Sequence, residues 1–104
     1  MRRKLREAFQ LKHKNTIEAT NLLGQSCPLI CSFPSAVQAT AKHNEDFQTA
    51  ILETARAGGD NAGRAAMIGS WIGARLGVDE LPQGWIRKLN RAPEILSILE
   101  GWGL

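Results

Sequence analysis

The segment at residues 57–64, AGGDNAGR, holds the residues whose types and spacing best suit chemistry. Its two adjacent glycines let the chain turn sharply and place the carboxylate of Asp60 where a helix is expected to begin. A carboxylate oxygen suits magnesium or calcium, but these ions need several oxygen ligands. The spacing alone therefore favours Asp60 as a helix cap over a metal ligand.

Arg64, one turn into the same expected helix, has two interpretations. Together with the free N–H groups at the start of the helix, its guanidinium can hold a phosphate or another anion. Alternatively, it can pair with Asp60, four residues earlier on the helix surface, and need no ligand. The sequence leaves both interpretations open.

The thiols and indoles give weaker signals. Cys27 and Cys31 lack two further ligands at a zinc-like spacing, so we expect them to be buried small apolar residues. A cysteine nucleophile would need a nearby histidine, and His43 stays open for that role. Three indoles can stack on a base or a sugar, but their spacings better suit a core or an anchor at the chain end. They are Trp71, Trp85 and Trp102.

The elements that position these groups are predicted to be helices, because apolar residues recur every three or four positions and no stretch alternates. A weakly amphipathic helix opens the chain, and a second covers residues 16–23. A third begins at Pro28 or Pro34 and runs towards residue 43, and a fourth is capped by Asn44. A fifth covers residues 62–76, and short helices follow Pro82 and Pro93.

Two helix faces are expected to be buried. On the fourth helix the face comprises Phe47, Ala50, Ile51, Ala55 and Leu52. On the fifth helix a stripe of small residues should let a neighbouring backbone approach closely, although each interior glycine costs about 1 kcal/mol relative to alanine. The stripe comprises Ala62, Ala66, Gly69 and Gly73.

Length and composition limit the class of protein. A chain of 104 residues with 43% apolar side chains forms one domain at most. Its longest apolar or small run, residues 65–74, is far below the roughly 20 residues that cross a bilayer. No secretory signal is recognisable, so we expect a soluble cytoplasmic protein. The basic charge at residues 1–14 fits a solvated helix face, and no motif indicates a nucleic-acid partner.

A series of motifs follows in one order along residues 27–89. It comprises Ser32-Phe33-Pro34, a helix with Phe47 and the run 50–52, the Gly58-Gly59-Asp60 turn, a helix of small residues, and Leu-Pro-x-x-Trp at residues 81–85. In this order the motifs resemble the carboxyl-terminal part of the ADP-ribosylglycohydrolase family. The resemblance implies an all-α orthogonal helical bundle, with residues 1–104 forming a single, partial domain of that kind.

The resemblance also implies a chemistry. Family enzymes use two magnesium ions, held by acidic residues of an amino-terminal motif and of a Gly-Gly-Asp-Thr-Asp-Thr turn, to hydrolyse the glycosidic bond to ADP-ribose. Here Asp60 alone carries over as a metal ligand. Asn61, Ala62 and Gly63 stand where that turn has threonine, aspartate and threonine. GGDNAGR is instead similar to a divergent branch of the family that includes the J-type crystallins.

These features lead to one functional hypothesis and one alternative. The chain is expected to be a carboxyl-terminal fragment or remnant of a magnesium-dependent ADP-ribosylglycohydrolase-like hydrolase, with Asp60 as a metal ligand. Its partners would be ADP-ribose or an ADP-ribosylated group, and a missing amino-terminal half or second chain. The alternative is a non-catalytic, crystallin-like or helical interaction module of the same fold.

Overall fold

The computed structural model describes residues 1–103, and all regular structure in that part of the chain is helical. The elements in order are α1 (Arg2–Gln10), α2 (Thr16–Leu23), α3 (Leu29–Lys42), α4 (Phe47–Ala57), α5 (Asn61–Leu76), the short 3₁₀ helix η1 (Val78–Glu80), α6 (Gln83–Lys88) and α7 (Ala92–Gly101). The prediction of an all-α fold is confirmed. Of the two candidate prolines, Pro28 caps α3, and Pro34 lies inside that helix.

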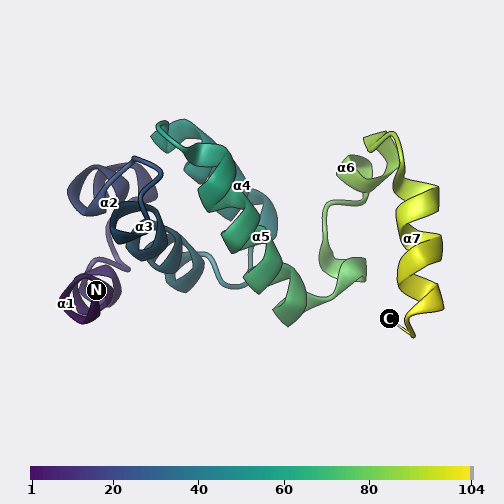
Figure 1. Cartoon of the computed structure of the whole chain (residues 1–104), viewed down its shortest axis with the longest axis horizontal. Helices are drawn as coiled ribbons and strands as arrows, with labels where there is room; N and C mark the ends of the chain where they lie inside the picture. Colours follow the sequence, from purple (N-terminus) through teal and green to yellow (C-terminus); the bar gives the residue numbers. More distant parts are fainter. Residues whose placement is uncertain (104) are drawn as a thin grey trace.

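The core lies where α3, α4 and α5 meet. Its buried residues are Ala36 and Ala39 of α3, Ala50 of α4, and Ile68 and Ile72 of α5. Alanines on two of the three helices let the helix axes come close, so the two isoleucines of α5 fill the space between them. Around this centre α2 packs on α3 and α4, and α1 packs on α3 (Figure 1).

The buried face of α4 was predicted only in part. Ala50 is in the core and Phe47 and Ile51 pack against it, as expected. Ala55 and Leu52 are exposed, and Thr54 and Ala57 are buried instead. The buried face centres on Ala50, Thr54 and Ala57, and Ala55 lies about 140° around the helix from Ala50 although it follows Ile51 by four residues. The expectation for Ala55 and Leu52 is therefore wrong.

The small-residue stripe of α5 receives side chains rather than a backbone. A Cβ placed on Gly69 would lie 3.6 Å from Cδ1 of Ile51 and 3.7 Å from the ring of Phe47. At the amino-terminal end of the stripe, Ala62 and Ala66 are exposed. The close backbone approach predicted for this stripe is therefore wrong.

Helices α6 and α7 lead away from the rest of the molecule (Figure 1). The chain measures 41 × 24 × 23 Å, and α7 packs on α6. Trp71 and Trp85 make edge-to-face contacts with Phe33 and Phe47 but stay partly exposed, and Trp102 is 72% exposed. Of the two placements expected for these tryptophans, a core or an anchor at the chain end, the core is wrong.

One further finding concerns membranes. Across residues 1–103, no helix has the length and apolar character that crossing a membrane would require.

The start of α4 differs from the prediction of an Asn44 cap. The N–H of Asp46 donates to the carbonyl of His43 over 3.0 Å, which closes a turn and leaves Asn44 inside it. Asp46 is the residue that caps α4, accepting from the N–H of Thr49 at 3.0 Å and from its hydroxyl at 2.6 Å. These two hydrogen bonds lower the pKa of Asp46, because they favour the ionised carboxylate.

Replacing Asp46 by alanine is expected to lower the free energy of unfolding by about 1 kcal/mol, the usual value of an N-cap. Asn44→Ala is the matched control and should change it by less than about 0.5 kcal/mol. Folding lowers the pKa of Asp46. The difference in the free energy of unfolding between wild type and D46A should therefore be largest above pH ~4 and decrease below it. Urea unfolding followed by circular dichroism measures the free energy of unfolding of each variant at each pH. Equal decreases in D46A and N44A would contradict the assignment of Asp46 as the cap.

Candidate functional site

The Gly-Gly-Asp turn joins α4 to α5 and needs both of its glycines. Gly58 has φ +74° and Gly59 has φ +64°, a conformation that residues with a Cβ rarely adopt. At Gly59 there is a second constraint, because a Cβ there would overlap the carbonyl oxygen of Gln25. The turn therefore packs closely against the loop between α2 and α3, an approach that the two glycines permit.

The buried side chain of Arg64 ties this turn to that loop. Arg64 is only 1% exposed, and its Nη1 donates to the carbonyl oxygen of Gln25 over 2.7 Å. Its Nη2 donates to the carbonyl oxygen of Gly58. The same Gln25 oxygen accepts from the N–H of Asp60 at 2.9 Å, and the Gln25 side chain donates to Ala57 at 2.8 Å. The loop and the turn thus form one hydrogen-bonded unit.

Both sequence interpretations of Arg64 are wrong. A surface ion pair with Asp60 is excluded because Arg64 is buried and its two terminal nitrogens donate to backbone carbonyls. Its burial and the same two bonds direct the guanidinium to backbone carbonyls rather than to the surface at the start of the helix, where an anion would bind. Burial lowers the pKa of Arg64, and the charge of Asp60 partly offsets this effect. Arg64 is a structural cation that holds the turn closed.

Asp60 begins α5 as its cap, which confirms the structural part of the prediction. Its Oδ1 accepts from the N–H of Gly63 over 3.3 Å. A Cβ on Gly63 would come within 2.5 Å of Asp60 Oδ2, so the absence of a side chain there gives the carboxylate room. The second oxygen of Asp60 makes no hydrogen bond within the described residues.

The acidic residues around Asp60 do not by themselves suit a magnesium pair. Within residues 1–103, no three histidine, cysteine, aspartate or glutamate side chains are grouped so that they could hold a metal ion. Ala62, where the family turn has its second aspartate, is exposed and brings only a methyl group. Magnesium takes about six oxygen ligands, so Asp60 alone does not make a site.

The two cysteines are not a catalytic pair with histidine. Cys27 is exposed in the loop before α3, so its expected burial is wrong, and Cys31 is half-buried against Gly24. Cys31 lies at the start of α3 and His43 just after its end, roughly 18 Å apart along the helix axis. A cysteine nucleophile activated by His43 is therefore excluded.

His43 has a structural partner instead. Its Nε2 lies 3.0 Å from the hydroxyl of Thr16, the buried first residue of α2. Burial and the charge of Lys42 lower the pKa of His43 below its usual 6.5, against the opposing effect of two nearby carboxylates. The neutral ring therefore joins α3 to α2.

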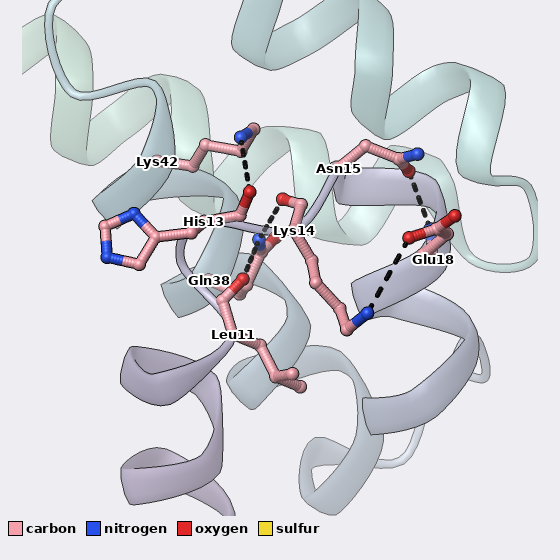
Figure 2. A network of polar contacts seen from close by, with 7 residues as sticks. All are labelled: Leu11, His13, Lys14, Asn15, Glu18, Gln38 and Lys42. Carbon is pink, nitrogen blue, oxygen red and sulfur yellow. Dashed lines mark hydrogen bonds and ion pairs between the residues drawn. The ribbon is translucent and has the colours of Figure 1, made fainter.

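A second network, which the sequence did not reveal, fixes the segment between α1 and α2 (Figure 2). The buried Gln38 of α3 donates from Nε2 to the carbonyl oxygens of Leu11, at 3.0 Å, and Lys14, at 3.2 Å. Lys42, one turn further along α3, donates to the carbonyl of His13 at 3.4 Å. A glutamine on an alanine-rich face was the only available sequence signal, and it did not identify these partners.

Asp60 lines none of three prominent hollows on the surface of residues 1–103. The largest, about 1000 Å³, lies between α5 and α7, and a shallower apolar one of about 240 Å³ lies between Phe47 and α6. The third, about 290 Å³, is between α1 and α2. The candidate metal ligand and the largest hollow are therefore different parts of the molecule.

Comparison with known proteins identifies a family. The family model described as ADP-ribosylglycohydrolase matches residues 1–102. Crystallin J1A of Tripedalia cystophora is 30% identical over 94 residues, which are 90% of this chain and 29% of the crystallin. Crystallin J1B of the same organism is 28% identical over 90 residues, which are 86% of this chain and 28% of that crystallin.

A named glycohydrolase is also similar. The ADP-ribosyl-[dinitrogen reductase] glycohydrolase of Rhodospirillum rubrum is 36% identical over 50 residues, which are 48% of this chain and 17% of that protein. The chain thus spans less than a third of the length of each of these three relatives. No solved structure matches it.

Replacing Arg64 by methionine is expected to destabilise the protein by about 1–3 kcal/mol, because the carbonyl oxygen of Gly58 loses its donor, whereas that of Gln25 keeps the N–H of Asp60. Arg75→Met is the matched control: Arg75 also lies on α5, but its 3.0 Å pair with Glu45 is exposed. That variant should lose about 1 kcal/mol or less. Urea unfolding compares the two, and an R64M loss no greater than that of R75M would contradict the structural role.

Proposed function

The chain belongs to the ADP-ribosylglycohydrolase family, and we propose that it forms the carboxyl-terminal part of a magnesium-dependent hydrolase domain that cleaves glycosidic bonds to ADP-ribose. It contributes the Gly-Gly-Asp turn, and the rest of the domain contributes the other carboxylates. On this proposal residues 1–104 are a partial domain. The substrate class is ADP-ribose attached to a side chain or another group.

The position of Asp60 carries the proposal. Its carboxylate stands at the start of α5 on a turn held by Arg64, and only Oδ1 is engaged, by the N–H of Gly63. A fixed carboxylate with an unengaged oxygen is suited to be one ligand of a site that other residues complete. The name of the Rhodospirillum rubrum relative, a glycohydrolase for an ADP-ribosyl group, supports the substrate class.

The setting is proposed to be the cytoplasm. Cys27 and Cys31 are both free thiols, and Cys27 is exposed. Exposed free thiols are typical of proteins that work in a reducing compartment.

The alternative is a non-catalytic member of the family, a crystallin-like or helical interaction module. The specific observation in its favour is Ala62, because the methyl group removes one carboxylate from the turn that defines the family's metal site. The two crystallins that match most of this chain support it as well. In this alternative Asp60 is only a helix cap.

The full chain alone is expected to release no ADP-ribose from an ADP-ribosylated peptide in the presence of magnesium, because one carboxylate does not make a metal site. Asp60→Asn is the control, since asparagine caps a helix as well as aspartate but lacks the charge. Chromatographic detection of free ADP-ribose is the measurement. Turnover by the wild type that D60N abolishes would show that this chain already contains a complete site.

Restoring the second carboxylate tests Asp60 as a ligand. Ala62→Asp should give saturable magnesium binding in calorimetric titration, at least tenfold tighter than the wild type, because two carboxylates then flank the turn. The double variant with Asp60→Asn should lose this gain. If A62D binds magnesium no better than the wild type, a carboxylate at residue 62 does not form a site with Asp60, and the non-catalytic alternative is favoured.

A further inference from the structure

The largest of the three hollows described above is a mainly apolar groove between α5 and α7, here called the α5–α7 groove. One wall consists of small residues of α5, among them Gly69, Gly73 and Ala74, and the other carries Leu96 and Leu99 of α7. Its volume is about 1000 Å³. Small residues on one wall and leucines on the other are the surfaces between which a further helix packs closely.

The apolar residues around the groove are unusually exposed for a folded chain. Within α7 only Ala92 is buried. Leu96 on the groove wall is 37% exposed, and Val78 at its end is also exposed. Apolar side chains gathered on one face in this way mark a surface that another molecule covers.

The elongated chain exposes more surface than a compact monomer of its mass. The accessible surface is 6701 Å² for a mass of 11.4 kDa, whereas a compact monomer of that mass exposes about 5,800 Å². The radius of gyration is 14.5 Å, against about 13 Å for a compact domain of this length. The excess of roughly 900 Å² is close to the ~800 Å² that each partner buries in a standard interface.

The lining of the groove excludes the substrate as its occupant. A nucleoside diphosphate needs cations or free N–H groups for its phosphates, and Glu100 is the charged residue of the lining. The hydroxyl of Ser70 donates to the carbonyl of Ala66 over 2.7 Å, so it offers no donor to a ligand. The groove therefore suits an apolar polypeptide surface, with Glu100 placed to attract a lysine or arginine at its edge.

We propose that the α5–α7 groove is the docking face for the part of the ADP-ribosylglycohydrolase domain that this chain does not contain, presented as a helix with an apolar face. The length comparison identifies this occupant, because the chain spans only 29% of Crystallin J1A. The rest of that crystallin has no counterpart in this chain, and the groove offers an apolar surface between two helices on which it could pack. The inference rests on the proposed function only in taking the chain as a partial domain.

Co-expression tests the proposal. The full chain is produced together with the part of Crystallin J1A that lies outside its match to this chain, so that the two polypeptides can fold together. A 1:1 complex of these two polypeptides is expected on purification. Leu96→Glu should reduce the recovered complex at least tenfold, because a carboxylate would enter an apolar interface. Leu29→Glu, at a residue that is 64% exposed on α3, is the matched control and should leave recovery unchanged.

Each other outcome overturns the proposal. The absence of a complex, or equal recovery with L96E and L29E, would exclude this groove as the docking face. Self-association of the chain in sedimentation equilibrium that L96E abolishes would assign the groove to a second copy instead. Circular dichroism of each variant alone checks that the helices are retained. Because no magnesium or substrate is present, failure here is distinct from failure of the A62D titration, which tests Asp60.

Discussion

The buried guanidinium of Arg64 is the interaction on which the candidate site depends. It donates to the carbonyl oxygens of Gln25 and Gly58, which belong to two segments far apart in the chain. A planar side chain with several donors can bridge two carbonyls at once, whereas the ammonium of lysine is a point charge on a flexible stem. Because backbone dipoles compensate the cation, the carboxylate of Asp60 is free to cap α5.

In this turn the backbone conformation and the ability to bind a metal ion depend on different residues. The glycines and Arg64 preserve the shape, because the turn cannot close without them. Chemistry needs several carboxylates within reach of one cation, and in the described residues Asp60 has no such companion. A chain can therefore keep the backbone of such a turn while Ala62 stands where the resemblance to the family implies a carboxylate, since the two properties depend on different residues.

The sequence predicted what local rules determine. The all-helical fold and Asp60 as the cap of α5 follow from periodicity and capping, which act within a few residues. The prediction of Asn44 as the cap of α4 was wrong, because a turn precedes the helix and Asp46, two residues later, is the cap. The roles of Arg64 and Gln38 were missed because their partners are backbone carbonyls up to 39 residues away, and residue types do not reveal such partners.

The prediction that the tryptophans form a core failed for a different reason. Periodicity and residue size identify surfaces that must be covered, but not the polypeptide that covers them. Trp85 meets Phe47 by an edge, and Trp102 and the apolar residues of α7 are left exposed. In a chain that spans under a third of its relatives, an exposed apolar helix is the expected result when part of the core belongs to absent helices. On the proposal that this chain is a partial domain, the error about these residues and the α5–α7 groove have one cause, because the surface that covers both would lie outside this chain.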